Sequence, residues 1–152
     1  RGQWSPDRLV PQFERTVGGL YSVRGYPESV TAGDTVLIAN AEYRLHVPRL
    51  FGLEPDPRTL FGKPFRHAPQ YVYGRPDWDL IFRGFFDYGK VYNTDRRSFE
   101  TDFDLMGAGG GVELLYRRNV NVRMDWGVAL EPLNGRVTSG SQQIHIVATL
   151  LY

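Results

Sequence analysis

Five stretches of the chain alternate apolar and polar residues with a period of two, the pattern of β-strands that have one apolar and one polar face. They cover residues 35–45, 78–92, 103–117, 119–130 and 143–152. The clearest stretch is 119–130, in which Val120, Val122, Met124, Trp126, Val128 and Leu130 alternate with Asn119, Asn121, Arg123 and Asp125. Each stretch has about ten residues or more, which is longer than a usual globular strand and suits a tilted membrane-spanning strand. The pattern predicts an all-β chain with about five long antiparallel strands.

The alternation leaves the outward face undecided. In a membrane barrel the apolar face meets lipid and the polar face lines the lumen, whereas a soluble barrel reverses this assignment. A soluble antiparallel β-barrel that binds a small apolar ligand is therefore an alternative to a transmembrane β-barrel. Because membrane barrels take at least about eight strands, we expect these five to form a partial barrel, as a fragment or as one part of an assembly.

Turn-rich connections separate the predicted strands. Long connections at 93–102 and 131–141 and a short one at 117–119 are typical of outer-membrane barrels, which have long extracellular loops and short periplasmic turns. The connection 46–77 breaks this rhythm, because it holds six of the ten prolines where a short turn is expected. We predict a loop over residues 1–34, barrel strands over 35–152, and a Pro-rich insertion at 46–77.

Composition removes several classes of function. The chain of 152 residues has no cysteine, so disulfides, thiolate metal sites and cysteine nucleophiles are excluded. A net charge of +1 gives little support to a nucleic-acid partner. The 17 glycines and 21 aromatic residues favour sheets whose backbones approach closely, and no apolar run is long enough for a membrane-spanning helix.

The sequence offers no convincing catalytic or cofactor site. Its three histidines are far apart, and no nucleophile-elbow motif occurs. The acidic residues Glu100, Asp102 and Asp104 could hold calcium, but acidic loops are usually just solvated. We therefore expect no enzymatic activity, no cofactor and no metal.

A glycine-rich stretch on one predicted strand holds Gly107, Gly109, Gly110 and Gly111. It does not fit the spacing of a phosphate-binding loop, and no helix is predicted after it. We expect these glycines to let a folded-back loop, residues 1–34, approach the inner wall closely.

Two motifs carry a resemblance to a known family. Residues 13–26 contain Val23-Arg24-Gly25-Tyr26 and are followed by Ala32-Gly33-Asp34 and Glu42-Tyr43-Arg44; a second motif, Phe85-Phe86-Asp87-Tyr88-Gly89, lies on the second predicted strand after them. This arrangement resembles the outer-membrane superfamily of BamA and the two-partner secretion transporters (TpsB, ShlB and FhaC), which includes bacterial surface antigens and haemolysin activators. In that family the Val-Arg-Gly-Tyr motif lies at the tip of a long extracellular loop that folds back into the barrel.

The resemblance implies a role for each motif. Residues 1–34 would act as a lid, locked by a charge pair between Arg24 and Asp87, with Val23, Gly25 and Tyr26 completing the lid motif. Phe85, Gly89 and the strand glycines would form the barrel wall that the lid meets.

The resemblance also implies a location and partners. The chain would lie in the outer membrane of a bacterial cell, in contact with its lipid, and POTRA domains would precede it. The combination of Arg24-Gly25-Tyr26 with Gly33-Asp34 is more similar to the secretion branch, which exports a partner protein without ATP. Insertion of other outer-membrane proteins, as by BamA or TamA, is the alternative.

The end of the chain resembles the aromatic-ended last strand by which outer-membrane proteins are recognised for assembly. Leu150 and Tyr152 would carry this signal, although Val147 stands where a glycine is usual. An aromatic residue at the membrane interface explains Tyr152 equally well.

Overall fold

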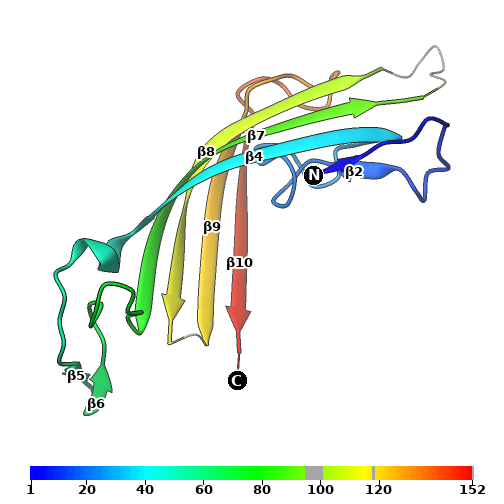
Figure 1. Cartoon of the computed structure of the whole chain (residues 1–152). Helices are drawn as coiled ribbons and strands as arrows, with labels where there is room; N and C mark the ends of the chain where they lie inside the picture. The colour runs from blue at the N-terminus through cyan, green and yellow to red at the C-terminus, as the bar shows by residue number, and fades with distance from the viewer. Residues whose placement is uncertain (95–100, 118, 152) are drawn as a thin grey trace. The chain divides into compact units, whose positions relative to one another are not determined.

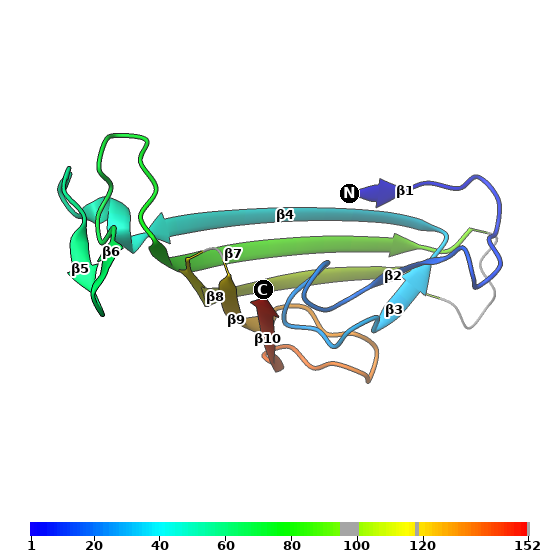
Figure 2. The same cartoon turned by 90° about the horizontal axis from the view of Figure 1, so that it is seen from below.

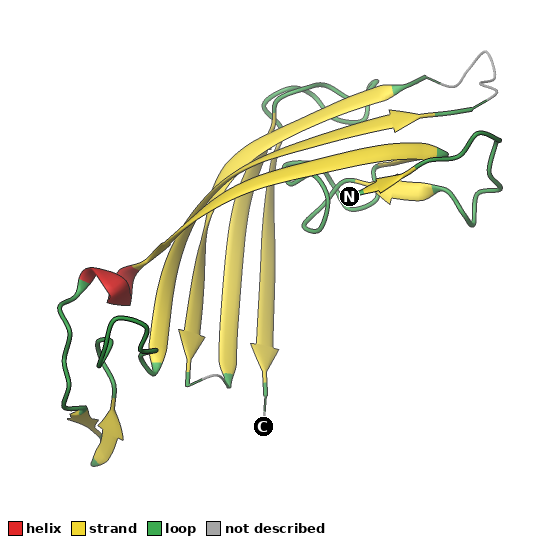
Figure 3. Ribbon diagram, in the orientation of Figure 1, coloured by secondary structure: helices red, strands yellow, loops and turns green. Residues whose placement is uncertain are grey.

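The protein is an all-β chain in a computed structural model that describes residues 1–94, 101–117 and 119–151 (Figure 1). Its elements are β1 (Gly2–Gln3), β2 (Arg15–Val17), β3 (Thr31–Gly33), β4 (Thr35–His46), the 3-10 helix η1 (Val47–Leu50), β5 (Arg58–Leu60), β6 (Lys63–Phe65), β7 (Trp78–Tyr92), β8 (Phe103–Tyr116), β9 (Val120–Ala129) and β10 (Gln142–Leu150). The described residues contain no α-helix (Figure 3). Accordingly, none of them forms a helix long and apolar enough to cross a membrane.

Six strands form one antiparallel sheet in the order β1-β4-β7-β8-β9-β10 (Figure 2). The long strands are neighbours in chain order, as in a meander whose connections join adjacent strands. At one edge β1 pairs with β4, with Gly2 opposite Leu37. Within the described residues the sheet is open, with β1 and β10 at its edges.

The five long strands predicted from alternation are confirmed. Their ends agree with the predicted ranges to within one or two residues, which is the usual uncertainty of strand boundaries. They have 9 to 15 residues each, the shortest being β10 and the longest β7. Tyr152 lies outside the described residues.

The prediction that residues 1–34 form only loop is wrong. This lid segment, as we call residues 1–34, contains β1 and a small hairpin of β2 and β3, in which Arg15 lies opposite Gly33 and Val17 opposite Thr31. Two or three residues are too few to show a period of two, so alternation could not reveal these strands.

The Pro-rich insertion is also more structured than a plain connection. It starts with η1 and contains the β5–β6 hairpin, in which Leu60 pairs with Lys63. The two residues between them, Phe61 and Gly62, have φ angles of +52° and +71°. Two successive positive φ angles are typical of a type I′ turn, which matches the twist of a hairpin.

Two compact units divide the chain, and each of the five long strands contributes to both. The first unit comprises residues 1–42, 84–110 and 125–145, and the second comprises 43–83, 111–124 and 146–152. The hydrophobic core lies in the first unit, where the lid segment packs against the sheet. Its buried members are Val17, Val23, Tyr26, Val36, Ile38, Val91, Leu105, Ala129, Leu133 and Val137.

The two faces of the long strands differ sharply in exposure. Large apolar side chains on one face are exposed, namely Leu37, Tyr43, Phe82, Phe86, Leu114, Val122, Met124, Trp126, Ile144, Ile146 and Leu150. Charged residues on the opposite face are buried, namely Arg83, Asp87, Glu113 and Asp125. The burial pattern of β7 shows this directly, because exposed Phe82 and Phe86 alternate with buried Arg83 and Asp87. The usual arrangement of a water-soluble sheet is thus reversed.

Candidate functional site

The lid segment holds its motif in a compact turn. The Gly18 amide donates a hydrogen bond of 2.8 Å to the Ser22 hydroxyl, and the Gly19 amide donates one of 3.1 Å to the Val23 carbonyl. Gly18, Gly19 and Gly25 have φ angles of +115°, +94° and +99°, a region that only glycine enters without strain. The glycines around the motif therefore fix the backbone path that presents Arg24 to the sheet.

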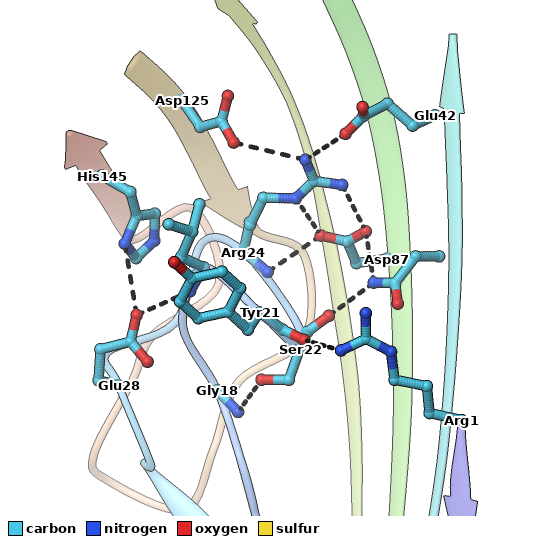
Figure 4. Close-up of polar contacts among 12 residues, drawn as sticks. Arg1, Gly18, Tyr21, Ser22, Arg24, Glu28, Glu42, Asp87, Asp125 and His145 are labelled. Carbon is cyan, nitrogen blue, oxygen red and sulfur yellow. Dashed lines mark hydrogen bonds and ion pairs between the residues drawn. The ribbon is translucent and has the colours of Figure 1, made fainter. Parts of the chain in front are cut away.

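Arg24 meets Asp87 of β7 through three hydrogen bonds (Figure 4). Its Nε donates to Oδ2 at 2.7 Å, its Nη2 to Oδ1 at 2.9 Å, and its backbone amide to Oδ2 at 3.1 Å. Both residues are buried, Arg24 at 4% exposure and Asp87 at 0%. This bidentate geometry is the strongest form of an arginine–carboxylate pair. The contact expected between Arg24 and Asp87 is present.

Two further carboxylates face the same guanidinium. Arg24 Nη1 donates to Glu42 Oε2 of β4 at 2.7 Å, and lies 3.5 Å from Asp125 Oδ2 of β9. Burial lowers the pKa of Arg24, but the hydrogen bonds and attraction from Asp87 and Glu42 outweigh that effect and hold the pKa above its ordinary value. One cation from the lid segment thus meets three anions from three strands.

The remaining contacts complete the surroundings of this pair. The guanidinium carbon of Arg24 lies 3.5 Å from the ring centroid of Phe85, close enough for a cation–π contact. The Asn40 side-chain amide donates to Asp87 Oδ1 at 2.8 Å and to the Ser22 carbonyl at 2.6 Å. Asn40 therefore joins the strand carboxylate directly to the backbone of the lid segment.

Tyr26 anchors the motif on its other side. Its hydroxyl lies 2.7 Å from the Glu131 carbonyl and accepts a hydrogen bond of 3.2 Å from the Met106 amide. The Tyr26 side chain is fully buried within the hydrophobic core. Arg24 thus fastens the turn to β4, β7 and β9, and Tyr26, two residues later, fastens it to β8 and to Glu131.

Glycines on the strands make room for the lid segment. A Cβ atom on Gly107 of β8 would overlap the carbonyl oxygen of Arg24, and one on Gly89 of β7 would lie 2.8 Å from a methyl carbon of Val23. On β9, a Cβ on Gly127 would lie 2.6 Å from the amide nitrogen of Gly25. The close approach of the lid segment that was expected at the glycine-rich stretch is present at Gly107, and Gly89 makes room for it in the same way.

Replacing Gly107 by valine should push the lid segment off the sheet. Valine favours strands, but its Cβ would collide with the fixed backbone carbonyl of Arg24, so overpacking should cost about 1–3 kcal/mol. Proteolytic cleavage within residues 13–34 of the folded protein should become faster. Gly84→Val is the matched control, because a Cβ on Gly84 of the same sheet meets nothing within 4 Å. Equal cleavage rates in both variants would contradict this packing.

Other predicted site residues do not join this cluster. A Cβ on Gly109 would meet the Trp126 carbonyl and the Phe85 ring, so this glycine makes room between strands and not, as was expected, for the lid segment. Gly111 belongs to the second unit, and its part in a barrel wall stays a prediction. Leu150 is exposed on β10, and Tyr152 lies outside the described residues. The assembly signal therefore stays a prediction.

Four members of the site could not be assigned to it from the sequence. Glu42, Asp125, Asn40 and Gly127 contact the motif, yet none was singled out as its partner. The sequence does contain a signal for three of them. Asn40, Glu42 and Asp125 each lie on the polar face of a predicted strand, as Asp87 does.

Among the residues that the structure describes, no group of three or more His, Cys, Asp or Glu side chains is placed to hold a metal ion. Of the acidic residues considered for calcium, Asp104 accepts a hydrogen bond of 2.8 Å from the Tyr88 hydroxyl and lies 3.5 Å from Lys90 Nζ. Glu100 lies outside the described residues.

Comparison of this chain with protein-family models, with curated proteins and with solved structures gave no match.

Proposed function

We propose that this chain forms part of the wall of a bacterial outer-membrane β-barrel that exports a partner protein, with the lid segment locked against the polar face of the wall. One observation carries the membrane part of this proposal: large apolar side chains of the long strands are exposed while the charges on their other face are buried. Exposing so many apolar side chains to water is unfavourable, whereas contact of the same face with lipid is favourable.

Strand length supports the same assignment. Strands of 9 to 15 residues match the span that tilted strands need to cross a membrane. A soluble barrel around an apolar ligand would need Phe82, Phe86 and Trp126 to face inward, and all three are exposed. The exposure of these three side chains therefore argues against a soluble barrel that binds an apolar ligand.

The proposal of protein export rests on the two motifs and on their contact. Val23–Tyr26 and Phe85–Gly89 lie in the order found in the secretion family, and Arg24 and Asp87 join them through three hydrogen bonds. In this proposal the lid segment blocks the polar path at rest, and its release opens a path for an unfolded partner chain. No nucleotide takes part.

Two neighbouring residues of β9 test the orientation of the faces. Asn121 lies on the polar face and Val122 is exposed on the apolar face, and the chain contains no native cysteine to interfere. In the full-length protein in lipid vesicles, brominated lipid should reduce the fluorescence of an apolar dye attached at Val122→Cys, but not at Asn121→Cys.

The matching control uses a water-soluble maleimide. It should label Asn121→Cys faster than Val122→Cys, because only the polar face of the wall meets water. Reversed labelling, or loss of the protein from vesicles on a wash without detergent, would rule out the membrane wall.

A further inference from the structure

The Pro-rich insertion is packed firmly within the second unit. The ring of His67 stacks on those of Phe51 and Trp78, with centroid distances of 5.1 Å and 5.5 Å, and the Phe51 and Trp78 rings lie 6.4 Å apart, so the three form a cluster. The Trp78 indole also donates a hydrogen bond of 2.9 Å to the His67 carbonyl. This cluster joins two parts of the insertion to the start of β7.

Polar contacts hold the insertion at a second point. Arg66 donates to Asp77 from Nε at 3.0 Å and from Nη2 at 2.7 Å, and the Asp77 carboxylate also accepts the Arg66 amide at 2.8 Å. Phe65 stacks on Tyr116 of β8 at 6.1 Å. The insertion therefore has a defined position on the ends of β7 and β8 in this unit.

A cavity of about 910 Å³ lies between the insertion and these strands. Six cationic and three acidic residues line it, namely Arg44, Arg49, Lys63, Arg66, Arg75 and Arg117 with Asp77, Asp79 and Glu113. Apolar side chains, among them Trp78, Ile81 and Leu115, complete the lining. The cavity therefore combines an excess of positive charge with apolar surface.

The carboxylates in the lining have partners of their own. Asp77 pairs with Arg66, Asp79 Oδ2 lies 2.7 Å from His46 Nδ1, and Glu113 accepts a hydrogen bond of 3.0 Å from Asn121. By contrast, Arg49, Lys63 and Arg75 form no ion pair with any residue that the structure describes. These three residues, which we call the cationic triad, leave a charge that a ligand could neutralise.

The same insertion exposes two apolar tips. Phe61, in the β5–β6 turn, is 94% exposed, and Tyr73 is 89% exposed beside the exposed Tyr71 and Val72. Aromatic residues with cationic neighbours are the side chains that proteins place at a membrane surface. A free phosphate ester would need the cationic triad but would give the apolar tips no role.

We propose that the insertion binds the phosphodiester headgroup of an anionic phospholipid, with the cationic triad on the phosphate and the apolar tips in the lipid interface; this proposal rests on the membrane function proposed above. Arginine and lysine are the usual ligands of phosphate groups in proteins. The insertion would thereby tie one end of the wall to a membrane leaflet rich in such lipids.

The test measures lipid binding by the full-length protein. In detergent micelles, native mass spectrometry should detect bound phosphatidylglycerol, and the triple variant Arg49→Gln, Lys63→Gln, Arg75→Gln should weaken this binding on the order of 100-fold. Binding of phosphatidylcholine should change little. Arg58→Gln is the matched control, because Arg58 lies in the same insertion, is paired with Glu54 and does not line the cavity.

The outcomes separate this proposal from the membrane function. Unchanged phosphatidylglycerol binding in the triple variant would overturn the lipid site, while a protein that still inserts into vesicles would keep the proposed function. A second binding measurement uses glycerol 3-phosphate, which is a free phosphate ester. If it binds at the cationic triad and phosphatidylglycerol does not, the site takes a free phosphate ester and the lipid proposal fails.

Discussion

Replacing Arg24 by alanine is expected to release the lid segment at rest and to impair export of the partner protein, because the path then no longer closes and reopens around each partner chain. The change takes from buried Asp87 the guanidinium that holds it through two side-chain hydrogen bonds, and removing one partner of a buried ion pair typically costs about 3–5 kcal/mol. The strands themselves do not need Arg24, so strand content measured by circular dichroism should remain nearly unchanged. Protease cleavage within residues 13–34 and secretion of the partner by intact cells are the two measurements.

Three comparisons make this result specific. Arg24→Lys keeps the charge but loses the bidentate pair and the contact with Phe85, so it should lie between wild type and Arg24→Ala. Asp87→Ala should resemble Arg24→Ala, and the double variant should be less affected than the sum of the two. Arg136→Ala is the control, because its exposed guanidinium also holds the lid segment, through a hydrogen bond of 3.0 Å to the Val30 carbonyl, but lies outside the buried cluster around Arg24. Wild-type secretion in Arg24→Ala would refute the lock.

Placing a charge on the outward face of β7 should be the second most damaging change. Phe86 is 46% exposed, and in water its replacement by arginine would cost little. In a membrane wall the same change should cost about 2–4 kcal/mol if Phe86 lies near the bilayer midplane. The free energy of unfolding, measured by urea titration of the full-length protein in lipid vesicles, gives the result.

Phe13→Arg is the matched control for this experiment. Like Phe86, Phe13 is an exposed aromatic residue, with 69% of its surface accessible. Unlike Phe86, it belongs to the lid segment and not to a long strand. Its replacement should change the free energy of unfolding by less than about 1 kcal/mol. Equal costs in the two variants would mean that both side chains meet water, and the membrane assignment would fall.

The long strands could be predicted because their signal is local. Each has enough residues for a period of two to emerge, as in Val120–Ala129, and the turn residues between them mark their ends. The hairpin of Arg15–Val17 with Thr31–Gly33 could not be predicted in this way, because three residues carry no period. Its strands form through pairing with each other and through burial of Val17 in the core.

The site was predictable in part for a related reason. The motifs around Arg24 and Asp87 could be found by resemblance, and alternation placed Asp87 on the polar face. Pairing register decides which other polar residues lie level with Asp87, and alternation leaves shifts of register by two residues undecided. Glu42 and Asp125 could therefore be assigned to the correct face but not to Arg24.

The contact of Arg24 with three carboxylates has a consequence for ion permeation. In the proposed open state Arg24 leaves with the lid segment, so the positive charge that it brings to Glu42, Asp87 and Asp125 is lost from this part of the sheet. The open path past these carboxylates would attract cations more strongly than the closed one, as rings of carboxylates do in cation channels. Its selectivity would weaken at high ionic strength, where the field of the carboxylates is screened.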